Sequence, residues 1–259
     1  MNGTAVSTPA VPAGYETRRE RGATVVALPS VIEEVRSCIG QAGSLYAAAA
    51  AAGVQAFTGR GAAWRLPHPA GDWVVRHYRR GGAIARLLRD GYLRTGEPRP
   101  LRELRVSALV RARGVETPEV LAAVVYPDGI LYRGDLATRY IADSCDLAEV
   151  TLGEAAADLE ERSAAWRAAG DLLRAAFAAG VEHADLNMRN ILIAGAPPRA
   201  LLLDLDRAVV RDRAVDESAR ARMIERLHRS RRKLEAATGR QTAGAELAAF
   251  DAALRSGNA

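Results

Sequence analysis

Short apolar runs separated by turn residues fill much of the first half of the chain. The runs Val54 to Phe57, Ala63 to Leu66 and Trp73 to Tyr78 predict three consecutive β-strands. Two more predicted strands, Val120 to Tyr126 and Ile130 to Ile141, are joined by a Pro-Asp-Gly sequence that is typical of a hairpin turn. These strands are expected to form an antiparallel sheet.

Apolar residues at helical spacing appear between and after these strands. They predict helices over residues 30–52, which are rich in alanine, and over 101–113, where apolar side chains share one face. A longer helix is expected to begin at Thr151, which has capping-box spacing to a glutamate, and to end at Gly180. A basic helix is expected over residues 216–237.

The order of these elements suggests two lobes within one domain. Residues 1–20 are rich in Pro, Thr, Ser and Ala without periodicity, which predicts a flexible arm. A length of 259 residues with 49% hydrophobic and 26% charged residues suits a globular core. The expected fold class is α+β. An amino-terminal antiparallel-sheet lobe with one key helix spans 21–142, and a reduced, mostly helical lobe spans 143–259.

Four polar residues in the second lobe have the spacing of a phosphoryl-transfer centre. His183, Asp185 and Asn190 form an H-x-D-x-x-x-x-N sequence, and Asp204 ends an apolar run 19 residues after Asp185. A kinase must orient a hydroxyl toward the γ-phosphate of ATP and hold Mg²⁺ against the phosphate oxygens. Asp185 is therefore predicted to orient the acceptor hydroxyl, and Asn190 and Asp204 to bind Mg²⁺. The alternative is that these acids are ordinary turn and strand-end residues.

A glycine pair in the first lobe is a candidate phosphate-binding loop. Gly59 and Gly61 lie between two predicted strands, and Trp64 stands where a third glycine would complete the G-x-G-x-x-G sequence. Glycine would let backbone amides approach the phosphates of ATP. The alternative is a plain hairpin turn.

The third predicted strand carries a candidate nucleotide-binding cation. Arg76 stands where protein kinases place a lysine, and the only lysine of the chain is Lys233. A guanidinium can bind phosphate oxygens through two nitrogens, so Arg76 is predicted to take this part, anchored by Glu103 on the next helix. The alternative is that Glu103 is a solvated helix residue paired with Arg99 or Arg102.

The charge and the cysteine content of the chain indicate its classes of binding partner and its cellular compartment. The net charge is +5 and the calculated pI is about 9.6, which favours anionic partners. The alternative is that the arginine content merely reflects a GC-rich genome. Nine arginines against three acids between Arg76 and Arg105 suit an anionic lipid surface or a phosphorylated acceptor. Two distant cysteines and no apolar run of membrane-spanning length favour a cytoplasmic protein. Nucleic-acid binding is not expected, because no zinc pattern, aromatic platform or helix-turn-helix signature accompanies the charge.

Taken together, these segments resemble the 3-deoxy-D-manno-octulosonic acid (Kdo) kinases of the lipopolysaccharide kinase family, which have a protein-kinase-like bilobal fold. The resemblance covers about residues 54 to 235. It departs from the family pattern in the alanine-rich amino-terminal extension and at Leu205, where the family commonly has phenylalanine. The matching segments are 59–61, 73–82, 99–105, 183–192 and 203–207.

The resemblance implies a function and a location. It implies ATP- and Mg²⁺-dependent phosphorylation of the 4-hydroxyl of Kdo on a lipid A precursor, with Asp185 in the position of the catalytic aspartate. It also implies peripheral attachment to the anionic cytoplasmic face of the inner membrane, with no obligatory protein partner. The alternatives are a small-molecule kinase of the aminoglycoside or choline type, a lipopolysaccharide heptose kinase, and a pseudokinase that binds anionic lipid.

Overall fold

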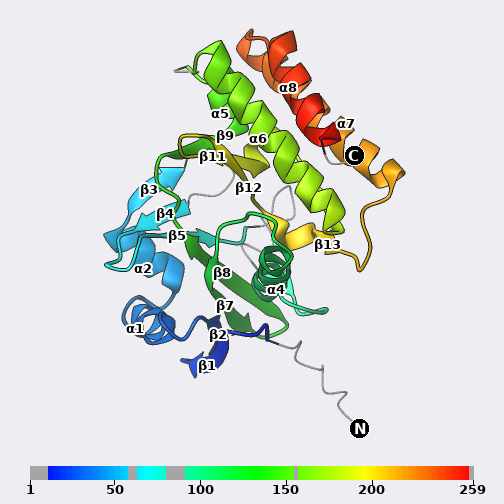
Figure 1. Cartoon of the computed structure of the whole chain (residues 1–259). Helices are drawn as coiled ribbons and strands as arrows, with labels where there is room; N and C mark the ends of the chain where they lie inside the picture. The colour runs from blue at the N-terminus through cyan, green and yellow to red at the C-terminus, as the bar shows by residue number, and fades with distance from the viewer. Residues whose placement is uncertain (1–10, 58–62, 80–90, 155–156, 257–259) are drawn as a thin grey trace. The chain divides into compact units, whose positions relative to one another are not determined.

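The computed structural model describes residues 11–57, 63–79, 91–154 and 157–256 (Figure 1). The chain divides into two compact units. Unit 1 comprises residues 1–108 and 119–140, and unit 2 comprises 109–118 and 141–259. The units differ from the predicted lobes chiefly in the segment 109–118, which belongs with unit 2. Within the described residues, no helix is both long and apolar enough to cross a membrane.

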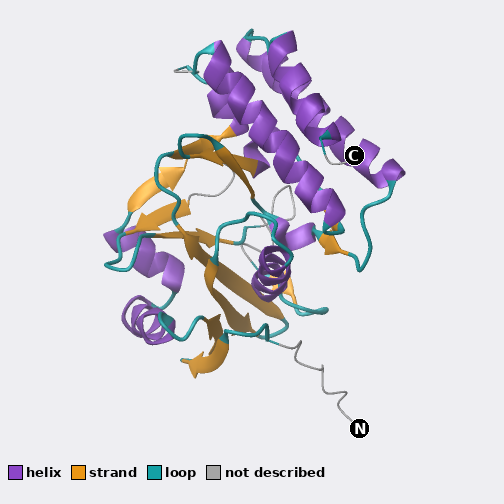
Figure 2. Cartoon of the chain, viewed as in Figure 1, coloured by secondary structure: helices purple, strands orange, loops and turns teal. Residues whose placement is uncertain are grey.

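Unit 1 is built on one antiparallel sheet with the strand order β1-β2-β7-β8-β5-β4-β3 (Figure 2). A short strand, β6, pairs with β8 beside this path. The five predicted strands are all present, and β1, β2 and β6 were not predicted. The strands are β1 (Glu16–Glu20), β2 (Ala23–Ala27), β3 (Val54–Phe57), β4 (Ala63–Leu66), β5 (Trp73–His77), β6 (Tyr92–Leu93), β7 (Val120–Asp128) and β8 (Leu131–Arg139).

The central strand β7 is buried on both faces. Alternate residues point to opposite faces of a strand. Ala122, Val124 and Tyr126 accordingly belong to one core cluster, and Ala123 and Val125 to the other. Helices α1 (Ile32–Ala42) and α2 (Leu45–Ala52) contribute to the first cluster, and α4 (Arg99–Ala112) contributes to the second. The sheet therefore holds α4, the predicted key helix, against one face.

Two predictions at the start of the chain need correction. Residues 16–20, assigned to the flexible arm, form β1, an edge strand that pairs with β2 and lacks an apolar run of its own. The single helix predicted over 30–52 is two helices. Gly43 ends α1 in the left-handed conformation with φ 80°, and the Ser44 hydroxyl then caps α2 by accepting a hydrogen bond from the Ala47 N–H at 3.0 Å.

A buried carboxylate ties the start of α2 to the sheet. Asp135 on β8 is fully buried, and it accepts hydrogen bonds from the Tyr126 hydroxyl at 2.8 Å and from the Tyr46 N–H at 2.9 Å. His77 Nδ1 lies 2.6 Å from the other carboxylate oxygen. Burial, together with this neighbouring carboxylate, raises the pKa of Tyr126. The negative carboxylate lies at the amino-terminal end of the helix dipole, where negative charge is favoured.

Unit 2 consists of helices around small sheets. The longest helices are α6 and α7, as the sequence predicted in outline, and α8 packs against α6. The sheets have the strand orders β12-β11-β9 and β10-β13. The elements are β9 (Ser144–Asp146), α5 (Leu147–Leu152), α6 (Leu159–Ala178), β10 (Val181–Glu182), β11 (Ile191–Ala194), β12 (Arg199–Leu202), β13 (Val209–Val210), α7 (Glu217–Thr238) and α8 (Gly244–Arg255), with short 3₁₀ helices η1 (Met188–Asn190) and η2 (Leu205–Arg207).

The predicted capping box at Thr151 is wrong. Thr151 lies in the last turn of α5, where its hydroxyl donates to the Leu147 carbonyl at 2.7 Å and accepts from the Trp166 indole N–H at 3.1 Å. The long helix begins at Leu159, and its cap is Asp158. The Thr-x-x-Glu spacing fits the capping-box rule. In the structure, however, Thr151 is buried and lies inside α5, so it does not cap the following helix.

The contact between α6 and α8 depends on a glycine. A Cβ added to Gly170 would lie 2.6 Å from the Phe250 carbonyl oxygen and 2.8 Å from the Ala253 Cβ. Trp166 packs edge-on against the Phe250 ring, with centroids 5.5 Å apart. The two helix backbones can approach this closely because position 170 has no side chain.

We expect Gly170→Ala to destabilise the protein by about 1–3 kcal/mol through overpacking. The helix propensity of alanine, which exceeds that of glycine by about 1 kcal/mol, acts in the opposite direction. The free energy of unfolding, measured by urea denaturation, checks this. Gly244→Ala is the matched control, because nothing lies within 4 Å of the added Cβ at that helix position. Equal stability of the two variants would contradict the close packing.

Candidate active site

The H-x-D-x-x-x-x-N segment forms a loop between β10 and β11 in unit 2. Asn187 shapes this loop with both ends of its amide. Its Oδ1 accepts a hydrogen bond from the Arg189 N–H at 2.9 Å, and its Nδ2 donates to the Asp185 carbonyl at 2.8 Å. This cap starts the 3₁₀ helix η1 and fixes the backbone between Asp185 and Asn190. Asn187 was not singled out from the sequence, although an Asn immediately before a short helical turn is a capping signal.

Asn190 closes the loop on its other side. Its Nδ2 donates to the same Asp185 carbonyl at 3.0 Å, and its own carbonyl accepts from the Leu203 N–H at 2.9 Å. Since the amide nitrogen is used in this bond, Oδ1 is the side-chain atom left to bind a cation. A neutral amide oxygen of this kind is a suitable ligand for Mg²⁺.

His183 connects the loop to the strand that precedes Asp204. The side chain is buried, its Nε2 lies 2.8 Å from the Leu203 carbonyl oxygen, and the Asp185 N–H donates to Nδ1 at 3.2 Å. These partners match the neutral tautomer, with the proton on Nε2. Burial lowers the pKa of His183 below its ordinary value of 6.5. The imidazole is therefore a neutral bridge between two segments of the site.

Asp204 adopts an unusual backbone conformation. Its φ of 58° and ψ of 63° lie in the left-handed region, which costs a non-glycine residue on the order of 1 kcal/mol or more. The residue is exposed, whereas Leu205 and Asp206 after it are buried. This turn keeps Asp204 at the surface beside the loop. In the described residues, no group of three or more His, Cys, Asp or Glu forms a metal-binding cluster.

Arg207 forms an ion pair with Asp185. The sequence analysis assigned it no function. Its Nη1 lies 2.8 Å from Asp185 Oδ2, and both side chains are about half exposed, at 61% and 49%. An exposed pair of this kind contributes only about 0–1 kcal/mol to stability. Its effect is instead to orient the Asp185 carboxylate. The signal in the sequence was its position three residues after Asp204.

Unit 1 brings together the other two predicted site residues that the structure describes. Arg76 on β5 forms an ion pair with Glu103 on α4, and Glu103 is buried. The Tyr78 hydroxyl donates to the second oxygen of the same carboxylate. Arg99, proposed as an alternative partner of Glu103, lies over the Tyr92 ring, with its guanidinium carbon 5.3 Å from the ring centroid. The predicted pairing of Arg76 with Glu103 is therefore found, with Tyr78 as a third member that the sequence analysis missed.

Gly59 and Gly61, the predicted phosphate-binding glycines, lie outside the described residues. The strands on either side of them, β3 and β4, pair as an antiparallel hairpin.

We expect His183 to make stability depend on pH. An unfolded imidazole takes up a proton near pH 6.5, whereas the buried one resists protonation, so the unfolded state binds more protons below that pH. Stability should therefore fall as the pH drops from about 7 to about 5, and His183→Asn should reduce this slope in urea denaturation. Burial also lowers the pKa of His228, so His228→Asn is the matched control that retains the His183 contribution. An unchanged slope in His183→Asn would contradict the assignment.

Comparison with known proteins agrees with this geometry. A sequence model of the lipopolysaccharide kinase (Kdo/WaaP) family matches residues 46–251. A 3-deoxy-D-manno-octulosonic acid kinase of Xanthomonas axonopodis pv. citri (strain 306) is 38% identical over 185 residues, 71% of each chain. The enzyme of the same name from Stenotrophomonas maltophilia (strain R551-3) is 36% identical over 178 residues, 68% of each chain.

A solved structure shows the same fold. The chain described as WaaP in complex with acyl carrier protein aligns with a TM-score of 0.54 and 17% identity, covering 92% of this chain and 88% of that one. The predicted α+β, kinase-like fold class is confirmed, and so is the predicted resemblance. The chain belongs to the lipopolysaccharide kinase (Kdo/WaaP) family.

Proposed function

We propose that this protein is an ATP-dependent Kdo kinase, which phosphorylates a sugar hydroxyl, the 4-hydroxyl of Kdo, on a lipid A precursor. Family membership and the names of its relatives support a kinase that acts on Kdo in lipopolysaccharide core biosynthesis. The observation that carries the proposal is the exposed Asp185 carboxylate, fixed on a loop whose other end presents Asn190. The small-molecule, heptose-kinase and pseudokinase alternatives are not favoured.

Asp185 is the proposed catalytic residue. Oδ2 pairs with Arg207, and within the described residues Oδ1 makes no hydrogen bond, so Oδ1 can accept one from the acceptor hydroxyl. As the hydroxyl oxygen bonds to the γ-phosphorus and the bond to the ADP oxygen breaks, the hydroxyl proton passes to Asp185. The ion pair with Arg207 fixes the position of Oδ2, which suits orientation of the nucleophile by the other oxygen.

Asn190 Oδ1 and the Asp204 carboxylate would hold Mg²⁺. The two groups form a neutral and an anionic oxygen ligand, and a site for Mg²⁺ on a nucleotide commonly has few protein ligands because phosphates and water complete the shell. Held by these residues, Mg²⁺ would supply positive charge that neutralises the phosphate oxygens of the nucleotide. Asn187 and His183 would position these ligands through their hydrogen bonds to the backbone of the loop and of Leu203.

Arg76 is the proposed nucleotide-binding cation of unit 1. Glu103 forms an ion pair with it, Tyr78 donates to the other oxygen of Glu103, and the Arg76 side chain is 32% exposed. The guanidinium is planar and can donate two parallel hydrogen bonds to a carboxylate or a phosphate group. Arg76 can therefore bind the nucleotide phosphates, as a lysine does in other kinases. Gly59 and Gly61 are proposed to bring backbone amides to the same phosphates.

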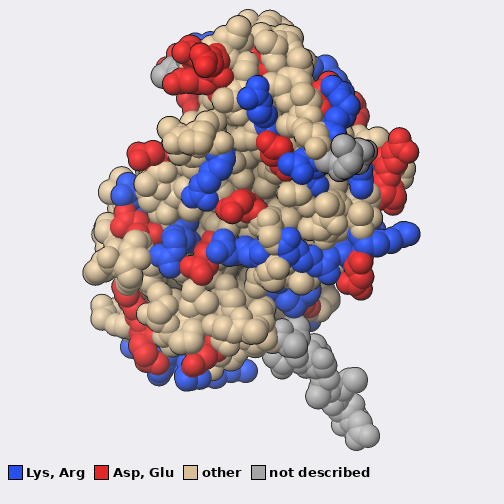
Figure 3. All heavy atoms as spheres, in the orientation of Figure 1, with Lys and Arg blue, Asp and Glu red and all other residues tan. Residues whose placement is uncertain are grey.

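We propose that the protein acts at the cytoplasmic face of the inner membrane, bound peripherally to anionic lipid. Basic and acidic side chains are interspersed on the face seen in Figure 3, so net charge alone does not locate a binding surface. The arginine-rich connector named from the sequence contains residues 80–90, which lie outside the described residues.

A basic stripe on α7 supports this location. Arg222, Arg226, Arg229 and Lys233 are spaced by four, three and four residues, so they share one flank of the helix. Over the described residues, the last three make no ion pair, whereas on other flanks Arg231 pairs with Glu235 and Arg232 with Glu225. A stripe of unpaired cations is suited to an anionic surface.

We expect Asp185→Asn to reduce phosphate transfer by roughly 100- to 10,000-fold, because it removes the proton acceptor. Mass spectrometry of a Kdo-bearing lipid A precursor incubated with Mg-ATP measures the added phosphate. Asp251→Asn, on the exposed face of α8, is the control and should retain wild-type turnover. Wild-type activity in Asp185→Asn would refute its role, and a wild-type protein that phosphorylates no Kdo-bearing lipid would refute the function.

We expect replacement of Arg226, Arg229 and Lys233 by alanine to weaken binding to vesicles containing phosphatidylglycerol. At about 1 kcal/mol for each basic residue, the loss is on the order of 100-fold. Co-sedimentation with these vesicles and with neutral phosphatidylcholine vesicles measures it. Alanine at Arg18, Arg199 and Arg232, which are exposed and ion-paired, removes the same charge and is the control. Equal binding by the two triple variants would contradict a role for the stripe.

A further inference from the structure

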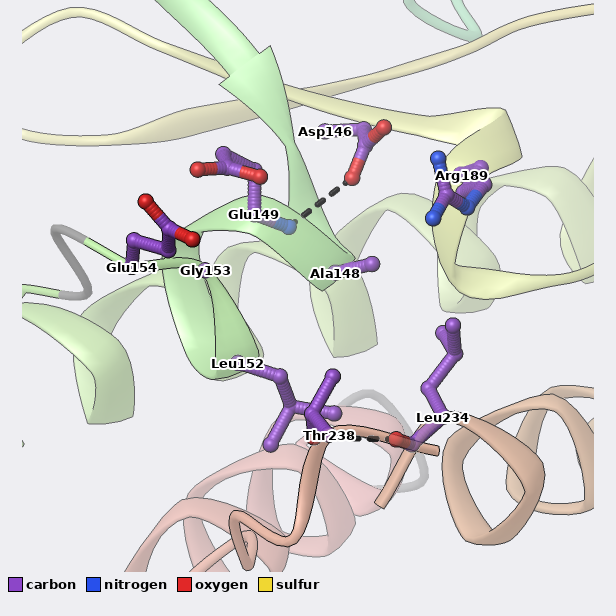
Figure 4. Close-up of a pocket in the computed structure, with 9 residues that line it drawn as sticks. All are labelled: Asp146, Ala148, Glu149, Leu152, Gly153, Glu154, Arg189, Leu234 and Thr238. Atoms are coloured by element: carbon purple, nitrogen blue, oxygen red, sulfur yellow. Dashed lines mark hydrogen bonds between the residues drawn. The ribbon is translucent and has the colours of Figure 1, made fainter. Parts of the chain in front are cut away.

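A cavity opens beside the Asp185 loop within unit 2. Its volume is about 380 Å³, and its walls come from α5, the end of α7 and the loop residue Arg189 (Figure 4). This volume lies within the range of small-ligand sites, roughly 300–1,000 Å³. The cavity is large enough for a single sugar residue.

The cavity is polarised. In Figure 4, the carboxylates of Glu149 and Glu154 lie on one side and the Arg189 guanidinium lies on the opposite side. The Asp146 carboxylate lies between them and accepts a hydrogen bond from the Glu149 N–H at 2.9 Å. Leu152 and Leu234 line the space below them. A ligand that carries hydroxyls at one end and an anionic group at the other would match this arrangement, because carboxylates accept hydrogen bonds from hydroxyls and guanidinium donates to anions.

The Arg189 side chain takes no part in the polar contacts that stabilise the described parts of the fold. Throughout the described parts of the chain, its side chain makes no hydrogen bond or ion pair, whereas the nearby Arg207 and Arg211 pair with Asp185 and Glu182. Its backbone is nevertheless fixed, because its N–H donates to Asn187. A well-placed arginine without a protein partner, facing a cavity, is suited to a ligand anion.

Arg189 is also close to the proposed catalytic residue. Arg189 is the fourth residue after Asp185, so the two Cα atoms lie no more than about 14 Å apart even if the chain between them were fully extended. The η1 turn shortens this span further. A ligand held by Arg189 can therefore have another of its atoms at Asp185.

We propose that this cavity is the subsite for the acceptor sugar, in which Arg189 binds the carboxylate of the sugar acid. Glu149 and Glu154 accept hydrogen bonds from its hydroxyls, and they repel the carboxylate, so the sugar can enter in only one orientation. This inference rests on the proposed function, because it takes the acceptor to be a sugar acid. The fork of the guanidinium matches a carboxylate through two parallel hydrogen bonds, which lysine cannot reproduce.

The test compares two acceptors and three proteins. The acceptors are a Kdo-bearing lipid A precursor and the same lipid with the Kdo carboxylate converted to its methyl ester. We expect wild-type kcat/KM to fall by about 10- to 100-fold on the ester, the loss of a hydrogen-bonded charge. Arg189→Ala should be equally poor with both acceptors, and Arg189→Lys intermediate. The KM for ATP should stay unchanged in all three.

Arg232→Ala is the matched control, since that exposed arginine lies outside the cavity and pairs with Glu225. A second variant, Glu149→Gln with Glu154→Gln, should raise the KM for both acceptors, because it weakens the hydrogen bonds from the sugar hydroxyls. An acid-to-ester ratio in Arg189→Ala as large as in the wild type would overturn the subsite. Circular dichroism verifies that each variant is folded.

The outcome is separable from that of the proposed function. Binding of free Kdo to the purified protein, followed by ligand-observed NMR, reports on the subsite without turnover. If the wild type transferred no phosphate to any Kdo-bearing lipid but bound free Kdo through Arg189, the kinase proposal would fail and the subsite would stand. If Arg189→Ala bound free Kdo as the wild type does, the subsite would be overturned whether or not the protein is active.

Discussion

The hydrogen bond between the His183 imidazole and the Leu203 carbonyl is the constraint on which the catalytic half of the molecule depends. It joins the loop that carries Asp185 to the strand end that precedes Asp204, two segments twenty residues apart in sequence. The imidazole performs this task only when neutral, because its Nδ1 must accept the Asp185 N–H. Burial supplies that condition by disfavouring the charged ring. A histidine in this position is therefore a structural part of the site.

Polar contacts of the backbone hold the loop and the proposed metal-binding positions. Asn187 and Asn190 both donate to the carbonyl of Asp185, and Leu203 donates to Asn190. These bonds leave the carboxylate of Asp185 and the oxygen of Asn190 exposed to a substrate. Rigid backbone with available side-chain oxygens is the arrangement that positioning and electrostatic stabilisation require in phosphoryl transfer.

Much of the fold was predictable because its sheet strands carry apolar runs bounded by turn residues, as β4, β5 and β7 do. The edge strand β1 was missed because it exposes most of its side chains and depends on β2 for its hydrogen bonds. The break between α1 and α2 was missed because apolar residues at helical spacing in α1 lead directly to the alanine run of α2, and Gly43 with Ser44 was included in one predicted helix. The motif residues were predictable from spacing, whereas Asn187, Arg207 and Tyr78 act through contacts that spacing does not encode.

The presence of arginine at position 76 has a chemical consequence. Electrophilic nucleotide analogues that acylate amines require a nucleophilic amine close to the bound nucleotide. In this chain the only side-chain amine is that of Lys233 on α7, and a guanidinium is far less nucleophilic at neutral pH because it stays protonated. Such reagents would fail to label the nucleotide site of this protein, so covalent inhibitors would have to address a different functional group.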